Sequence, residues 1–135
     1  MDSFYFFKES ILQKTSEKKA TAANQESLKE LVLSAIDDAK GNDIKVIDVS
    51  HHTQLLDYMI IASGTSSRHI QTIAEFAMKK AQENGYDKPA TEGLGHSEWV
   101  VVDFVDVVLH VMSPAAREHY NIEGLWEISS RPQDS

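Results

Sequence analysis

Hydrophobic residues recur along the chain with two different spacings, and the wider spacing predicts helices. Within residues 25–40 the apolar side chains stand three or four positions apart, at Leu28, Leu31, Val32, Ala35, Ile36 and Ala39. The same spacing follows the turn at residues 64–69, at Ile70, Ile73, Ala74, Ala77, Met78 and Ala81. Such a stripe is typical of one buried face of a helix. Ser27 with Glu30 resembles a capping box at the first helix start. Gly41 and Gly85 stand where each helix should end in a left-handed residue.

Shorter apolar segments between these helices predict five strands. They cover residues 43–49, 57–63, 89–93, 98–103 and 106–112. Ser113 before Pro114 then indicates a last helix, because proline is favoured at the first helical position. The predicted order is α-β-β-α-β-β-β-α. We therefore expect an α/β fold (an α+β mixed sheet) in one domain, with helices packed on a mixed five-stranded sheet.

The domain organisation follows from where this alternation begins and ends. Residues 25–128 carry the periodic segments and are predicted to form the domain. Residues 1–24 combine an aromatic cluster with a polar stretch, and we expect a flexible extension or a non-native addition. Residues 129–135 are expected to form a loose tail.

The two strands within residues 98–112 have faces of different character. Side chains alternate along a strand, so one face of this pair is uniformly aliphatic and belongs against the helices: Val100, Val102, Val107, Leu109 and Val111. The other face combines apolar and polar groups: Trp99, Val101, Asp103, Val108, His110 and Met112. Two interpretations of this second face remain open. The C-terminal helix covers it through Tyr120 or Trp126, or it stays partly open and meets a partner.

The partner interpretation is favoured by residue type, since Trp and Met are enriched at protein interfaces. The candidate partner-binding residues are Trp99, Val101, His110, Met112, Tyr120 and Trp126.

The net negative charge of the chain indicates which class of macromolecule it can bind. The chain has a formal net charge of −8. Residues 1–24 carry four Lys and three acids (+1), residues 25–85 six basic and nine acidic residues (−3), and residues 86–135 three basic and nine acidic residues (−6). An acidic body repels phosphate, so direct contact with nucleic acid is disfavoured. A basic protein is the partner that this charge favours; the alternative is that the charge serves solubility alone.

The residues that could support catalysis do not form a recognisable motif. Asp103 and Asp106, with the turn Gly64–Ser67, could imitate a nucleotide site that holds Mg²⁺ and phosphate. The two carboxylates are three positions apart across a turn, and turn aspartates commonly accept backbone N–H groups. The six histidines lack metal-ligand spacing, and the chain has no cysteine. We expect no enzyme activity, no cofactor and no metal. No apolar run approaches the ~20 residues of a membrane span.

Four segments together resemble the ribosomal silencing factor family, also called the Iojap-like family. They are DYMIIASGTSSRHIQTIA, then EG, then WVVVDFVDVVLHVM, then REHYNIEGLW, and they lie in residues 25–128. The resemblance implies a nucleotidyltransferase-like topology without catalysis. It also implies a cytoplasmic protein that binds ribosomal protein fourteen on the large ribosomal subunit and blocks joining of the small subunit when nutrients are limited. The protein would be a monomer or a homodimer. The alternative is a nucleotide-binding or nucleotidyltransferase-like enzyme that uses the Gly64–Ser67 turn.

The family's motif positions can be transferred to this chain residue by residue. Trp99 is the expected direct contact, with Val101 and Met112 beside it. A scaffold role is assigned to Asp57, Gly64, Ser67, Arg68, Glu92, Gly93, Asp103 and Asp106. The chain departs from the family at Val105, where glycine is usual. A β-branched residue resists positive φ, so we expect a turn of another type. The chain departs again at Gly124, where a basic or polar residue is usual, which should loosen the tail.

Overall fold

A computed structural model describes residues 22–125 with the exception of residues 52 and 96. Most of the predicted N-terminal extension, Trp126 and the predicted loose tail lie outside the described residues. Within the described residues the chain forms two long helices, one short helix and five strands. Their order is α2 (Ala22–Asp38), β1 (Asn42–Asp48), β2 (Tyr58–Ser63), α3 (Ser67–Glu83), β3 (Ala90–Glu92), β4 (Trp99–Asp103), β5 (Val107–Met112) and α4 (Pro114–Tyr120).

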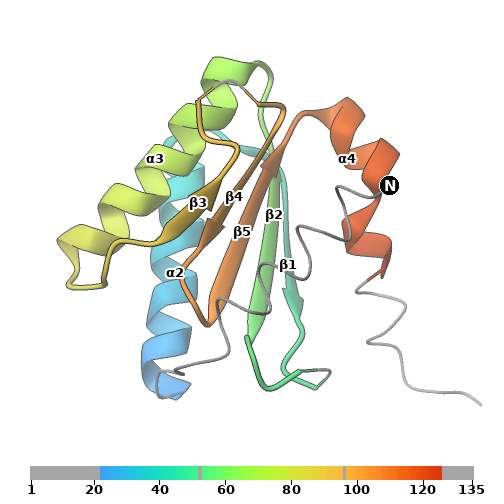
Figure 1. The fold of residues 1–135 in the computed structure, drawn as a ribbon. Coiled ribbons are helices and arrows are strands. Elements are labelled where there is room, and N and C mark those ends of the chain that lie inside the picture. Colours follow the sequence, from blue (N-terminus) through green and yellow to red (C-terminus); the bar gives the residue numbers. More distant parts are fainter. Residues whose placement is uncertain (1–21, 52, 96, 126–135) are drawn as a thin grey trace, which may run out of the picture.

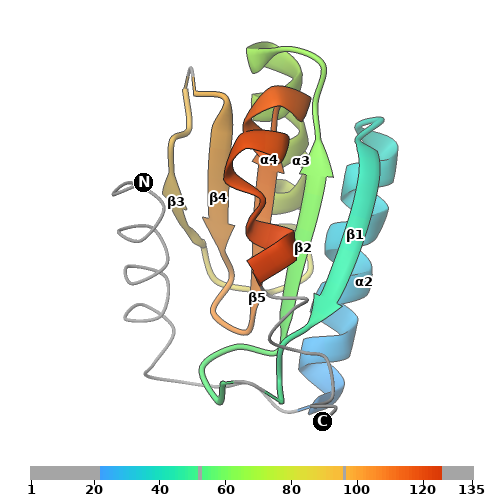
Figure 2. The ribbon, with the colours of Figure 1, turned by 90° about the vertical axis from the view of Figure 1, so that its right-hand side faces the viewer.

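The strands form one mixed sheet between two helical layers. The spatial order is β1-β2-β5-β4-β3. The central pair β2–β5 is parallel, and the other neighbours are antiparallel. Helices α2 and α3 cover one face, and the short α4 crosses the opposite face (Figures 1 and 2). The predicted fold class and element order are confirmed.

The face toward α2 and α3 carries the larger core. The five aliphatic residues predicted for this face of β4 and β5 are all buried in one cluster with the helix stripes. The main helix residues of that cluster have at most 3% of their surface exposed: Leu28, Val32, Ala35, Ile36, Ile70, Ile73, Ala74, Ala77 and Ala81. Removal of this apolar surface from water is the main favourable term in folding. The alternation in the sequence therefore assigned this face correctly.

The opposite face forms a second core. Trp99, Val101, Val108 and Met112 are buried there, and His110 lies among them on β5. The cover comes from α4 and from residues after it, through Ala116 and Ile122, with half-buried Tyr120 packed against the cluster. Each layer of the fold is therefore held by its own hydrophobic cluster on one side of the sheet.

Two predicted features of the helix ends need correction. Helix α2 begins at Ala22, so Ser27 lies within the helix and does not cap it. The left-handed residue after α2 is Lys40 (φ 65°), and Gly41 follows it, donating its N–H to the Ile36 carbonyl at 2.9 Å. A Cβ on Gly41 would lie 2.5 Å from the Ile36 side chain, so close packing explains this glycine. The prediction for Gly85 is confirmed, since its φ is 91°.

The turn between β4 and β5 holds Val105 in a strained backbone conformation. Its φ is 82°, and the Asp106 N–H donates to the Phe104 carbonyl at 3.1 Å across it. This is the rare form of γ-turn with positive φ at its centre. A β-branched side chain is disfavoured there. The expectation that Val105 produces a turn without positive φ is wrong. The Asp103 carboxylate, which accepts the Val105 N–H at 2.8 Å, helps to hold this turn.

Replacement of Val105 by glycine should stabilise the fold. Positive φ costs a non-glycine residue about 1–3 kcal/mol, while the added flexibility of glycine in the unfolded chain costs about 0.5–1 kcal/mol. We expect V105G to raise the free energy of unfolding by roughly 1 kcal/mol in urea titrations. Val46 on β1, 37% exposed, offers the control. V46G should be destabilising, and equal destabilisation by V105G would contradict the strain argument.

Candidate partner-binding surface

Trp99 lies beneath α4, and this burial argues against its expected role as the direct contact with a partner. Its exposed fraction is 6%, and Val101, His110 and Met112 are each at most 3% exposed. The Trp99 Nε1–H donates to His110 Nδ1 at 2.9 Å, and the Tyr120 ring lies 4.8 Å from the indole between centroids. Of the two interpretations of this face, the structure shows the covered one, with Tyr120 as part of the cover.

The hydrogen bond from Trp99 fixes the protonation state of His110. An indole N–H can only donate, so His110 Nδ1 must be unprotonated and the neutral ring carries its proton on Nε2. Burial lowers the pKa of His110 from 6.5 to about 3, because the charged ring would lose its hydration in the apolar core. His110 is therefore a neutral core residue that positions the indole, and it is not an acid–base group at neutral pH.

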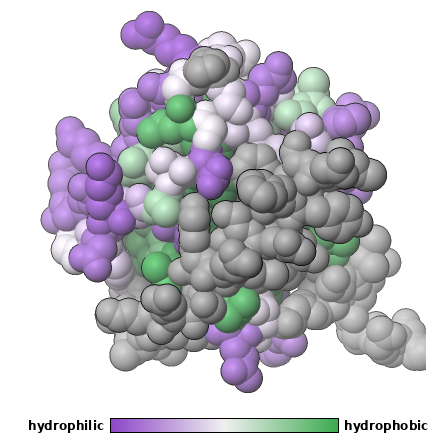
Figure 3. Space-filling model, in the orientation of Figure 1, coloured by the Kyte–Doolittle hydropathy of each residue, from purple (hydrophilic) through white to green (hydrophobic). Residues whose placement is uncertain are grey.

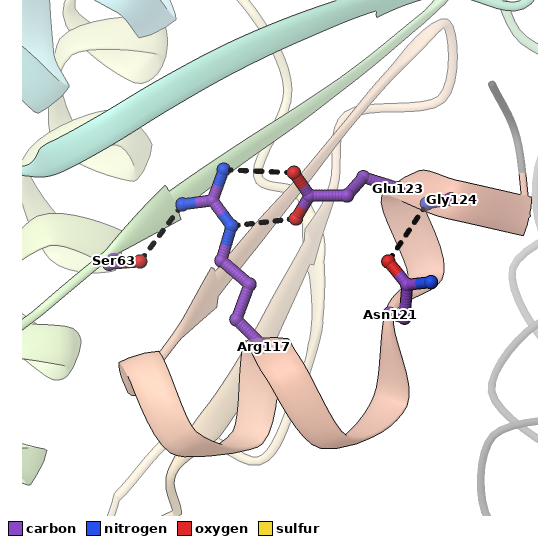
Figure 4. A network of polar contacts seen from close by, with 5 residues as sticks. All are labelled: Ser63, Arg117, Asn121, Glu123 and Gly124. Atoms are coloured by element: carbon purple, nitrogen blue, oxygen red, sulfur yellow. Dashed lines mark hydrogen bonds and ion pairs between the residues drawn. The ribbon is translucent and has the colours of Figure 1, made fainter.

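A polar network fastens α4 to the sheet. The Arg117 guanidinium donates from Nε and Nη2 to the two carboxylate oxygens of Glu123 at 2.7 and 3.3 Å, and from Nη1 to Ser63 Oγ at 2.9 Å (Figure 4). The side chains of Arg117 and Glu123 are 13% and 19% exposed, so this two-pronged ion pair is partly shielded from water. The network joins α4 to Ser63 at the end of β2 and to Glu123 in the segment that follows α4.

Asn121 shapes the segment that carries Glu123. It adopts a left-handed conformation (φ 47°) and ends α4. Its Oδ1 accepts the Gly124 N–H at 3.3 Å, as an N-cap would for the next helical turn (Figure 4). Gly124 therefore sits in a hydrogen-bonded turn. The tail that this glycine was expected to loosen lies outside the described residues. Sequence reasoning missed the roles of Arg117 and Glu123; a cation and an acid on either side of Asn121 were the available signal.

A hollow of about 490 Å³ lies beside α4, and Trp99 is one of its lining residues. Its described lining comes from the start of β4 and from one side of α4: Ser97, Glu98, Trp99, Ala115, Ala116, His119 and Tyr120. Glu98 is exposed and accepts the Ser113 hydroxyl on Oε1 at 2.8 Å. The chain thus brings an exposed acidic group and the half-buried Tyr120 ring to one place on its surface, next to the buried Trp99.

Three predicted scaffold residues gather where β2 and β5 begin. The Asp106 carbonyl accepts the N–H groups of Asp57 and Tyr58 at 2.8 and 3.2 Å, and the Asp57 carbonyl accepts the Val49 N–H at 2.9 Å. Asp57, Asp103 and Asp106 are 7%, 5% and 2% exposed. These contacts join the β1–β2 connection to the β4–β5 turn, and the scaffold role fits all three residues.

The other predicted scaffold residues lie at the opposite end of the sheet. A Cβ on Gly64 would lie 2.8 Å from the Ile70 side chain, and a Cβ on Gly93 (φ 81°) 2.4 Å from the Trp99 carbonyl oxygen. Both glycines are thus required by close packing. Glu92 is half-buried on β3. Ser67 and Arg68 are exposed in the first turn of α3. Arg68 forms no ion pair within the described residues, so a scaffold role for it lacks support.

This separation also leaves the alternative nucleotide site unassembled. The turn at Gly64 follows β2, whereas Asp106 precedes the parallel β5, and the six residues of β2 stand between these ends, roughly 20 Å at about 3.3 Å per residue. One Mg²⁺-bound phosphate group cannot contact both, because Mg²⁺ holds its oxygen ligands at about 2.0–2.1 Å. Ser66 is committed to capping α3 through the His69 N–H. His69 itself bridges the Thr65 N–H and the Ala39 carbonyl.

The described part of the chain has neither a cluster of metal ligands nor a membrane-spanning helix. Residues 22–125, without 52 and 96, contain no group of three or more His, Cys, Asp or Glu side chains arranged to hold a metal ion. None of the helices in that range is long and apolar enough to cross a bilayer.

The buried neutral His110 should make stability depend on pH. Between pH 6.5 and about 3 the unfolded chain binds a proton that the folded chain does not. Its contribution is therefore complete above pH 6.5 and is lost as the pH falls. From pH 7 to 5 the wild type should lose about 2 kcal/mol more than H110Q, whose amide oxygen can still accept the indole N–H. Chemical denaturation at both pH values measures this difference; equal losses would contradict the assignment.

Comparisons with known proteins place the chain in a family. Residues 19–135 match the family model described as ribosomal silencing factor during starvation. A protein of Chromobacterium violaceum named ribosomal silencing factor RsfS is 43% identical over 101 residues, 75% of this chain and 83% of the relative. The protein of that name in Bacillus subtilis is 37% identical over 103 residues, 76% and 87% of the two chains.

The structural comparison agrees with the sequence comparison. A crystal structure of a Chromobacterium violaceum protein superposes with a TM-score of 0.74 at 40% identity, covering 82% of this chain and 89% of that one. Fold, motif residues and sequence similarity thus lead to one conclusion: the chain belongs to the ribosomal silencing factor family.

Proposed function

We propose that this protein silences ribosomes by binding the large ribosomal subunit and physically excluding the small one. The contact is ribosomal protein fourteen, the location is the cytoplasm, and the effect is lower translation when nutrients are limited. The observation that carries the proposal is the family match over residues 19–135, whose description names ribosomal silencing during starvation. The names of two relatives, which are 37% and 43% identical to this chain, support the same role.

The charge distribution supports a basic protein as the immediate contact. Residues 86–135 carry a formal charge of −6, from three basic and nine acidic residues. They include exposed Glu98 and Glu118 near α4, where the one arginine of the helix is already paired with Glu123. An acidic surface attracts a basic protein and repels the phosphates of ribosomal RNA. Charge therefore favours docking on protein over docking on RNA.

The structure changes which atoms can make the contact. Because Trp99, Val101, His110 and Met112 are buried, they serve the docking surface from beneath, by holding α4 and Tyr120 in place. Half-buried Tyr120 and the hollow beside it present the accessible part of this region. Hydrophilic side chains gather instead along the outer side of α3, at the left of Figure 3. The contact surface proposed for ribosomal protein fourteen is the α4 side of the molecule.

Steric exclusion requires no chemical reaction. This agrees with a structure in which the residues of the alternative nucleotide site lie at opposite ends of β2. The chain needs a stable body and a surface that fits the large subunit. A monomer is sufficient for this mechanism, and a homodimer would enlarge the blocking body without changing its principle.

A subunit-joining assay tests the proposal. Saturating protein should lower the fraction of joined ribosomes in sucrose gradients and should co-sediment with the large subunit. Added free ribosomal protein fourteen should restore joining, because it competes for the same surface. Joining that continues at the normal level while the protein is bound to the large subunit would contradict steric exclusion. Calorimetry with Mg²⁺ and nucleoside triphosphates should show no binding.

A further inference from the structure

The hollow beside α4 combines three groups that together suit a cation. Its lining includes the buried Trp99 and the half-buried Tyr120, whose ring centroids are 4.8 Å apart at an angle of 41°. Its lining also includes the exposed Glu98. Aromatic faces attract cations through the ring quadrupole, and a carboxylate adds direct charge attraction.

Glu98 is held in place for such a contact while one of its oxygens remains available. The Ser113 hydroxyl donates to Oε1 at 2.8 Å, and the Ser113 N–H donates to the Glu98 carbonyl at 3.0 Å. Its Oε2 makes no hydrogen bond within the part of the chain that the structure describes. The side chain is thus restrained at the N-terminal end of α4, and its exposed position leaves Oε2 able to accept from a partner.

Tyr120 is restrained in the same way. Its ring packs on Trp99 on one side, and the exposed His119 ring meets it edge-on at 4.7 Å and 82°. The ring is half-buried, so ordering it on binding costs little additional side-chain entropy. Restrained aromatic groups in a surface hollow are typical of interface hot spots.

We propose that this hollow receives an arginine side chain of the basic protein partner. The guanidinium lies against the Tyr120 ring and donates to Glu98 Oε2, and its methylene stem covers the edge of the Trp99 indole. Arginine fits better than lysine because its flat group stacks on rings and donates from several positions at once. This inference rests on the proposed function, and it assigns the recognition to one acidic and one aromatic residue.

A second hollow provides a matched control. It has about 450 Å³ and lies on α3, lined by Glu75, Met78, Lys79, Gln82 and Glu83. It contains acids and is of similar size, but its described lining has a lysine and no aromatic ring. The substitution E83Q therefore removes the same charge from a comparable hollow without the features that suit a guanidinium.

The experiment measures binding of the full chain to purified large subunits, by co-sedimentation at several salt concentrations. E98Q should weaken binding about tenfold and reduce its salt dependence, because one charge pair is lost. E83Q should bind as the wild type does. Y120L should also weaken binding about tenfold, and Y120F, which keeps the ring, should not. The amide oxygen of E98Q can still accept the Ser113 hydroxyl, and thermal melts confirm that each variant is folded.

The outcomes separate the two levels of the proposal. If wild-type protein fails to bind large subunits, both the proposed function and the proposed arginine contact are refuted. If the wild type binds and folded E98Q binds equally well, only the proposed arginine contact in the hollow is refuted. Tighter binding of E98Q would mean that RNA phosphate faces the hollow, and it too would overturn the inference.

Discussion

The hydrogen bond from the Trp99 indole to His110 beneath α4 is the contact on which the second layer of this protein depends. It joins β4 to β5 across the face of the sheet at 2.9 Å and satisfies a polar group that would be costly to bury alone. It also requires a neutral imidazole, which an apolar core favours. With the indole fixed, Tyr120 and Ala116 pack on one continuous surface, and the Arg117 network locks α4 above it.

The sequence predicted which side chains share each face of the sheet, but it did not predict whether α4 covers the face that carries Trp99. Alternation separated Val100 and Leu109 from Trp99 and His110 correctly, because strand geometry leaves no other choice. Whether α4 closes over Trp99 depends on Arg117, Glu123 and Ser63. Ser63 stands 54 positions before Arg117, and no local pattern encodes that contact. Val105 was misjudged for a different reason: neighbouring contacts, including the Asp103 carboxylate, hold a backbone conformation that its side chain disfavours.

The motif residues divide into two structural groups at opposite ends of the sheet, and this division bears on function. Asp57, Asp103 and Asp106 organise the turns at one end, while Gly64 and Gly93 permit close packing at the other. The aspartates and the Gly64 turn could together resemble an active site, but the length of β2 keeps these two groups apart. The family's role suits a protein of this kind, whose two sheet faces are both covered and whose surface is what remains for recognition.

Cryo-electron microscopy of the protein bound to the large subunit tests the central claim most directly. The account predicts that α4 stays closed over Trp99 and that the side of the molecule carrying Glu98 and Tyr120 faces ribosomal protein fourteen. A complex in which the outer side of α3 or the outer edge of β1 makes the contact, or in which α4 has left the sheet and exposed the indole, would contradict it.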